Sequence, residues 1–194
     1  MSGFEPFDFQ RSCCPSNVLA LLGLICVGSM VGCAPALNWR EVRGSQAEVV
    51  ASFPCKPDLH VRQVRLEGLD GTLLPMTLRV CDVDGLTFAM TEVDVKDPAK
   101  VPTVMKNLLL GYASNIGVST IGSVRQDWGV KGMTPQPDGG RWQFEGAMPS
   151  GKSVQAETGL VSRGTVIVQV NVSGPTVTPD AAKQFFESFL FQSR

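Results

Sequence analysis

The stretch Thr165–Val172, TVIVQVNV, has the clearest strand pattern in the chain, and the rest of the predicted fold is arranged around it. Valine stands at every second position from Val166 onward, with isoleucine, glutamine and asparagine between the valines. A period of two places alternate side chains on opposite faces of a strand. The stretch therefore predicts a half-buried strand, with its valines toward a core and its polar residues toward solvent.

Eight other stretches have the β-branched, apolar composition of strands and are separated by turn residues. The first five follow one another with short connections, which predicts an antiparallel meander. Alternation is only partial in the third of them, HVRQVRL. The eight stretches are Trp39–Arg43, Ala47–Phe53, His60–Leu66, Leu73–Val80, Leu86–Val95, Val118–Trp128, Arg141–Met148 and Ser153–Ser162.

Two helices are predicted between and after these strands. Asp97-Pro98 is typical of a helix start, and Gly117 of a helix end. The second helix begins at Thr178-Pro179 and presents an aromatic face. The order strands, helix, strands, helix predicts an α+β domain, with an antiparallel sheet of about 8–9 strands and two main helices in a layered sandwich. The apolar faces are formed by Val101, Val104, Met105, Leu108, Leu109 and Tyr112, and by Ala182, Phe185, Phe186 and Phe189.

An apolar run near the start, Leu19–Val27, has the length of a signal-peptide core and is short for a membrane span. Small residues follow it up to Gly32. The pattern predicts an N-terminal signal helix within residues 1–32. Three alternatives stay open: a retained single-span anchor, an ordinary signal peptide and a helix of the globular core. Arg11 is the only basic residue of this leader, whereas signal peptides usually begin with a net positive charge.

The four residues Met30-Val31-Gly32-Cys33 resemble the lipobox of bacterial lipoproteins, although Met30 stands where leucine is more usual. The resemblance implies that a diacylglycerol is attached to the Cys33 sulfur, that a peptidase cuts before Cys33 and that the freed amino group is acylated, for example with palmitate. Residues 33–38 would then be a tether and residues 39–194 a single domain. Two or more acyl chains hold a protein stably at a bilayer. Ala34 stands where inner-membrane lipoproteins of enteric bacteria typically carry aspartate, which implies the outer membrane, facing the periplasm.

The chain has six cysteines, of which three lie in the leader and one is Cys33. Cys55 and Cys81 remain, and in an oxidising compartment they are predicted to form a disulfide that closes a loop of about 27 residues. A reactive thiol pair or a metal pair is the alternative. Neither cysteine belongs to a C-x-x-C motif and no histidine is near Cys81, so metal binding is not expected.

The charge balance argues against nucleic acid as a partner. The chain has 17 Lys and Arg and 18 Asp and Glu, and without Arg11, Glu5 and Asp8 of the leader the remainder is formally neutral. Binding to phosphates needs clustered cations. The partners we expect are therefore the membrane, through lipid on Cys33, and a protein of the cell envelope.

No set of catalytic residues is recognisable, so the chain is expected not to be an enzyme and to need no cofactor or metal. His60 is the only histidine, and its neighbour Asp58 is more typical of a strand end than of a catalytic base. Asp82-Val83-Asp84-Gly85 predicts a turn, because it lacks the further ligands of a calcium loop. Glu145 and Glu157 are considered as a pair of acids on adjacent strands, with a solvated face as the simpler interpretation.

Four aromatic residues form the remaining candidate site. Trp39, Tyr112, Trp128 and Trp142 are proposed as a possible ligand or partner surface. Burial in the core is the alternative for each, since large aromatic side chains contribute strongly to cores.

The order of elements resembles, loosely, the PsbP/Mog1-type α/β sandwich, a superfamily dominated by binding and assembly factors. With the lipobox, this resemblance implies a lipid-anchored envelope lipoprotein that serves as a non-catalytic interaction or assembly module facing the periplasm. The alternative function is a small-molecule-binding domain or weak enzyme, with a pocket between the sheet and the first helix.

Overall fold

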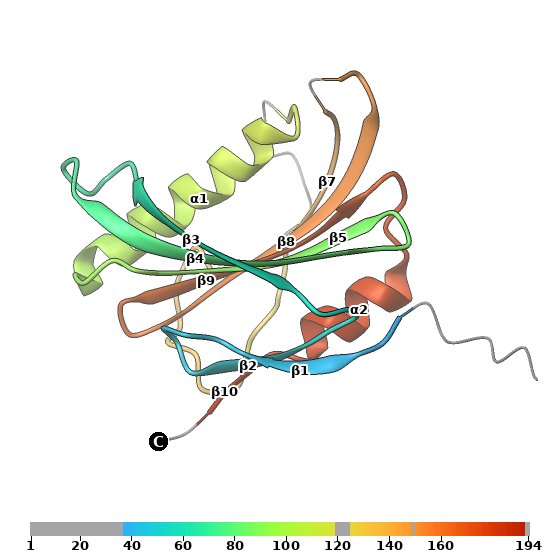
Figure 1. Ribbon diagram of the computed structural model, residues 1–194. Helices are drawn as coiled ribbons and strands as arrows, with labels where there is room; N and C mark the ends of the chain where they lie inside the picture. Colours follow the sequence, from blue (N-terminus) through green and yellow to red (C-terminus); the bar gives the residue numbers. More distant parts are fainter. Residues whose placement is uncertain (1–36, 119–124, 149, 193–194) are drawn as a thin grey trace, which may run out of the picture. The chain divides into compact units, whose positions relative to one another are not determined.

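The computed structural model describes residues 37–118, 125–148 and 150–192 (Figure 1). The predicted leader, Cys33 and the tether up to residue 36 lie outside the described residues. The described elements, in chain order, are β1 (Arg40–Arg43), β2 (Val49–Phe53), β3 (Asp58–Arg65), β4 (Leu73–Val83), β5 (Leu86–Asp94), the 3-10 turn η1 (Pro98–Lys100), α1 (Val101–Asn115), β6 (Arg125–Gln126), β7 (Gly140–Ala147), β8 (Ser153–Arg163), β9 (Val166–Gly174), α2 (Pro179–Glu187) and β10 (Leu190–Phe191).

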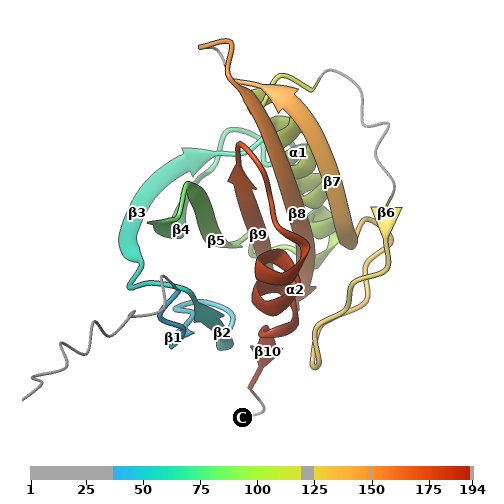
Figure 2. The same cartoon turned by 90° about the vertical axis from the view of Figure 1, so that its right-hand side faces the viewer.

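The strands form two antiparallel sheets, one of seven strands in the order β3-β4-β5-β9-β8-β7-β6 and one of three in the order β1-β2-β10. Helix α1 packs on one face of the seven-stranded sheet, over β8 and β9. Helix α2 and the three-stranded sheet pack on the other face (Figure 2). The predicted α+β class, with helices and antiparallel strands in layers, is confirmed.

The predicted meander of five strands is wrong for its first two. Strand β2 pairs with β1 and with β10, whereas β3, β4 and β5 form a meander in the other sheet. Pro54 and Pro57 stand in the connection between β2 and β3. Because proline has no N–H to donate, the chain leaves the first sheet there instead of continuing its ladder.

Strand β9 is the central strand of the large sheet, between β5 and β8. Its valines face α2, as predicted, but its other face is not exposed. Gln169 is 6% exposed and Asn171 is 8% exposed. Both lie on the face that α1 covers and are close to Thr158 of β8, to whose hydroxyl the Gln169 amide donates. The prediction of a half-buried strand is therefore wrong, since helices lie over both faces.

Helix α1 begins and ends where the sequence indicated. The side chain of Asp97 accepts a hydrogen bond from the backbone N–H of Ala99 at 2.9 Å, and Pro98 opens the 3-10 turn that leads into the helix. Gly117 follows the helix with φ of +74°, and a Cβ there would meet the carbonyl oxygen of Ala147 at 2.6 Å. Most of the predicted apolar face of α1 is buried against the sheet, while Leu108 and Tyr112 are half-buried.

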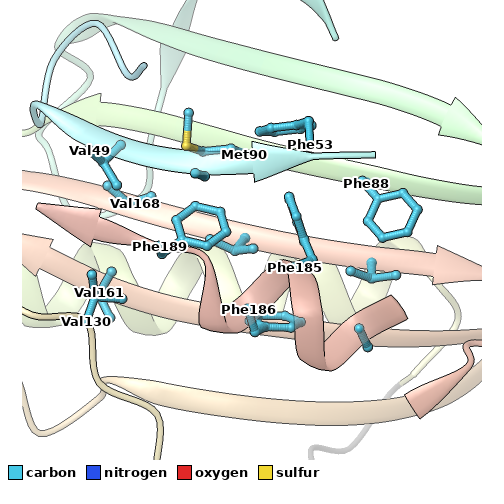
Figure 3. Close-up of a cluster of buried hydrophobic side chains, with 14 of the residues drawn as sticks. Val49, Phe53, Phe88, Met90, Val130, Val161, Val168, Phe185, Phe186 and Phe189 are labelled. Atoms are coloured by element: carbon cyan, nitrogen blue, oxygen red, sulfur yellow. The ribbon is translucent and has the colours of Figure 1, made fainter. Parts of the chain in front are cut away.

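Helix α2 supplies the aromatic centre of the second core (Figure 3). Pro179 occupies its first turn, although Thr178 makes no side-chain capping bond. The ring of Phe185 meets those of Phe53 and Phe88 edge-on, with centroids 5.0 and 5.2 Å apart. The predicted packing of this aromatic face on the sheet is confirmed.

The disulfide between Cys55 and Cys81 is present, with Cα atoms 5.9 Å apart. Cys55 lies in the connection after β2 and Cys81 lies in β4. The bond therefore links the chain leaving the small sheet to a strand of the large sheet. This confirms the predicted pairing.

The strand expected over Val118–Trp128 is much shorter among the described residues. Only Arg125–Gln126 pair, with β7, and residues 119–124 lie outside the described part. The segment that follows runs along the sheet and forms isolated bridges from Thr134 to Ser162 and from Lys131 to Leu190.

Candidate functional site

Strands β3 and β4 form an exposed extension at one side of the large sheet, which we call the β3–β4 wing (Asp58–Arg65 and Leu73–Val83). β3 is an edge strand of this sheet and, among the described strands, pairs with β4 alone (Figure 2). Its residues from 58 to 63 are exposed on both faces of the strand. Leu59 is 58% exposed and Val61 is 61% exposed. An edge strand that is open to solvent and carries exposed aliphatic side chains is a template for pairing with another chain.

One face of the wing is hollowed and apolar. The hollow measures about 420 Å³, and its apolar floor comes from Met76, Leu78 and Val80 of β4. His60 and Arg62 of β3 stand beside this floor, opposite Leu78 and Met76 in the strand register. This face continues toward α1, because Met76 packs against the cluster beneath that helix.

On the opposite face, a buried carboxylate joins the wing to the small sheet. Glu92 of β5 is fully buried and forms a salt bridge with Arg79 of β4, with 2.8 Å between nitrogen and oxygen. Its carboxylate also accepts hydrogen bonds from the backbone N–H groups of Ser45, Gln46 and Ala47 at 2.9–3.0 Å. A buried charge needs such partners. Glu92 therefore fixes the turn between β1 and β2 on the large sheet, which is a structural role.

A second hollow, of about 510 Å³, lies between β7, β8 and α2. Arg141 forms a salt bridge there with Glu157, and its guanidinium lies 4.2 Å from the centre of the Phe186 ring. Glu145 and Glu157, the pair of acids considered above, both line this hollow, but Glu145 is opposite Gln155 in the register and Glu157 is opposite Gln143. The two acids are thus diagonal neighbours, and Glu157 is already paired with an arginine.

The four predicted aromatic residues do not line one common groove. Trp39 and Trp128 pack against the core beneath α2, whereas Tyr112 and Trp142 belong to the core beneath α1. Trp128 also lines a surface hollow of about 360 Å³, while its indole N–H donates to the carbonyl of Phe186 at 3.2 Å. The two faces of the sheet thus separate the four residues into pairs.

Tyr112 lies beside Phe144 in the α1 core, with ring centroids 6.4 Å apart. Burial raises the pKa of its hydroxyl, and the nearby Ser173 side chain opposes that shift only in part. Among the described residues, the buried hydroxyl has no hydrogen-bond partner of good geometry. Because a buried hydroxyl without a partner costs free energy, the Tyr112 hydroxyl lowers the stability of this core.

The remaining candidate residues from the sequence lie on an exposed strand and in a turn. Asp58 and His60 lie on the exposed strand β3, and Asp84 and Gly85 form the turn between β4 and β5. In the described part of the chain, no three His, Cys, Asp or Glu side chains are grouped so as to hold a metal ion. Nor does any helix there have the length and apolar character needed to cross a membrane.

The alternative function needs a pocket between the sheet and α1. In the structure, the space between α1 and the sheet is filled by side chains, among them Met105 and Leu109 of the helix and Phe144 and Leu160 of the sheet.

The β3–β4 wing was not singled out from the sequence. The partial alternation of HVRQVRL was the available signal, since polar residues on both faces indicate a strand with neither face covered.

No protein-family model matches the chain, and no curated protein matches it. Among solved structures, the chain is similar to the crystal structure of LpqN, described as involved in cell envelope biogenesis of Mycobacterium tuberculosis. The two share 17% sequence identity, over 81% of this chain and 92% of that chain, with a TM-score of 0.34.

Proposed function

We propose that this chain is a lipoprotein, anchored by lipid on Cys33 in the outer membrane of a bacterial cell and facing the periplasm, which binds a protein partner without catalysing a reaction. The observation that supports the binding role is the β3–β4 wing. It exposes aliphatic side chains beside an open strand edge, and such a combination is suited to recognising another polypeptide.

The lipobox Met30-Val31-Gly32-Cys33 supports the anchor. The formally neutral domain offers no electrostatic attraction to anionic lipid, so membrane attachment would depend on the acyl chains. The disulfide between Cys55 and Cys81 is in keeping with an oxidising compartment, because such bonds rarely persist where thiols are kept reduced.

The anchor is tested by metabolic labelling of the full chain with palmitate in a bacterium that processes lipoproteins. We expect label on the wild-type chain, none on the Cys33→Ala variant, and a shift to slower migration when globomycin blocks the lipoprotein peptidase. An unlabelled wild-type chain whose migration is insensitive to globomycin would contradict the anchor.

The binding surface is tested by a photo-crosslinking amino acid placed at Val61 in the full chain. Leu110 of α1, 44% exposed, is the matched control because it is also an aliphatic residue on the surface. We expect a discrete crosslinked product from position 61 and none from position 110. Equal crosslinking from both positions would show that the wing is not the preferred surface.

A further inference from the structure

The geometry of the turn between β4 and β5 determines which residues of β3 direct their backbone N–H and C=O groups toward the open edge. The turn between β4 and β5 has two residues, Asp84 and Gly85, both with positive φ. Such a turn joins its flanking residues, here Val83 and Leu86, as a hydrogen-bonded pair. Bonded and non-bonded pairs alternate along an antiparallel ladder. Odd-numbered residues of β4 therefore bond to β5, and even-numbered residues bond to β3.

The register of β3 against β4 extends this alternation of bonded residues to the edge strand. Even-numbered β3 residues stand opposite even-numbered β4 residues, as His60 does opposite Leu78. The N–H and C=O groups of the odd-numbered residues Leu59, Val61 and Gln63 consequently point away from the sheet. The residues with the most exposed aliphatic side chains of β3 are thus also those with open backbone groups.

We propose that this edge binds the β3 strand of a second copy of the same chain, antiparallel, about a twofold axis at His60. The proposal rests on the proposed function, and names the partner that the wing binds. It joins the two large sheets of two anchored molecules into one continuous sheet, through about four backbone hydrogen bonds between the two edges.

The sequence of β3 is complementary to itself in this register. Leu59 stands opposite Val61 of the second copy, so four exposed aliphatic side chains gather on one face of the new ladder. On the other face, Asp58 stands opposite Arg62 of the second copy, which gives two opposite-charge pairs flanking His60. Cross-strand apolar and opposite-charge pairs both stabilise a sheet. The side chains of Asp58 and Arg62 form no hydrogen bond or salt bridge with another described residue, so both charged groups are available.

Neighbouring registers lack this match. An axis at Val61 places Asp58 opposite Val64 and Leu59 opposite Gln63, which leaves the acid unpaired. An axis at Arg62 places two arginines opposite each other, and like charges directly opposite are destabilising. The register at His60 is thus favoured by both charge and apolar pairing.

A pairing of two short strand segments buries far less than the roughly 1,600 Å² of a standard interface. The dimer is therefore weak between freely diffusing molecules. Lipid anchors confine both copies to one membrane surface and raise their effective concentration, which favours a weak contact. The dimer should accordingly be studied with the full chain in the membrane.

The test is disulfide crosslinking of the full-length, membrane-anchored chain with a mild oxidant, followed by a non-reducing gel. His60→Cys places two thiols at a non-bonded pair, where the Cα atoms are about 4.5 Å apart and within reach of a disulfide. Val61→Cys is the matched control, since its two copies would be offset by two residues and about 8 Å apart, which is too far. The unsubstituted chain controls for the native cysteines.

We expect a dimer band from His60→Cys at least tenfold stronger than from Val61→Cys. A band from Val61→Cys alone, equal bands from both variants, or no band from either would overturn the proposal.

A charge swap tests the register independently in the His60→Cys chain. Asp58→Arg places two arginines opposite each other at both ends of the ladder and should lower the yield of dimer about fivefold. Adding Arg62→Asp restores opposite charges and should restore the yield. An unchanged yield in the first variant, or no recovery in the second, would contradict the pairing.

The failures of the two proposals are distinguishable. A palmitate-labelled chain that gives no His60→Cys dimer, but a Val61 photo-product with another protein, would retain the proposed function and refute the second copy. An unlabelled chain would refute the anchor whatever the crosslinking result.

Discussion

Strands β9 and β3 both contain valines among polar residues, but they have opposite surroundings in the fold. Valine recurs at every second position in β9, whereas β3 alternates only in part, and β9 is buried on both faces while β3 is exposed on both. β9 has a strand on each side and a helix layer above and below, whereas in the part of the chain that the structure describes β3 has β4 alone as its neighbour. Alternation therefore indicates a strand, but the number of covered faces depends on neighbours that are distant in the sequence.

Valine to aspartate, made separately in each strand, should give the largest difference in the free energy of unfolding. Val168 of β9 is 0% exposed, and Val168→Asp would bury an unpaired carboxylate with a loss of more than about 4 kcal/mol in the free energy of unfolding. Val61→Asp in β3 should change it by less than about 0.5 kcal/mol, because the side chain stays in water. Urea unfolding followed by tryptophan fluorescence measures both. Comparable losses would show that the two strands do not differ as described.

Two carboxylates, one buried on β5 and one exposed on β3, extend the comparison between covered and uncovered strands. Glu92→Gln keeps the shape of a buried side chain but removes its charge from Arg79 and from three backbone N–H groups, so we expect a loss of about 3 kcal/mol. Asp58→Asn on β3 removes an exposed charge and should have little effect. The same unfolding measurement applies. If Glu92→Gln left the free energy of unfolding unchanged, the role given to this carboxylate would be contradicted.

The disulfide connects the wing to the better covered part of the molecule. Replacing Cys55 and Cys81 together by serine and alanine should lower the free energy of unfolding by about 3 kcal/mol, because the unfolded chain gains freedom. A reductant should lower the urea midpoint of the wild-type protein and leave that of the variant unchanged. If the reductant lowered both equally, the effect would have another origin.

The smallest effect concerns Tyr112, the only tyrosine of the chain. Because burial raises its pKa in the folded state above the ordinary value of 10.0, the folded protein should lose stability as the pH rises above about 10, where the unfolded chain ionises first. Tyr112→Phe should remove this loss and, at neutral pH, raise the free energy of unfolding by up to about 1 kcal/mol.

The ultraviolet absorption of tyrosinate reports this residue alone. We expect its titration midpoint to lie above 10 in the folded protein and to fall to the ordinary value in urea. A midpoint that is the same in both states would show that the hydroxyl is not buried.

Much of the fold could be predicted because local pattern and tertiary environment agree. Asp97-Pro98 and Gly117 bracket α1, and the aromatic residues at helical spacing gave the buried face of α2. The cysteine pairing followed from a count, since two cysteines remained once those of the leader and lipobox were set aside. Each of these signals is contained within a short segment or depends on composition alone.

The remainder depends on contacts that no local pattern records. Strand β10 has two residues, too few to show a period, and exists because β2 offers it an edge. The separation of Trp39 and Trp128 from Tyr112 and Trp142 depends on which face of the sheet each occupies. The burial of both faces of β9 likewise depends on the two helices, which its period of two does not record, whereas the partial alternation of β3 was a signal of its exposure.

The small sheet combines strands from both ends of the described chain. β2 lies between β1, which precedes it closely, and β10, which follows it by well over a hundred residues. A ribosome supplies the N-terminal segments first, so a nascent chain carries β1 and β2 long before β10 exists. Until Leu190 is synthesised, one edge of β2 has no partner, and Phe53 lacks the rings of α2 that cover it in the finished protein. The interval between these events is when the chain would need a chaperone most.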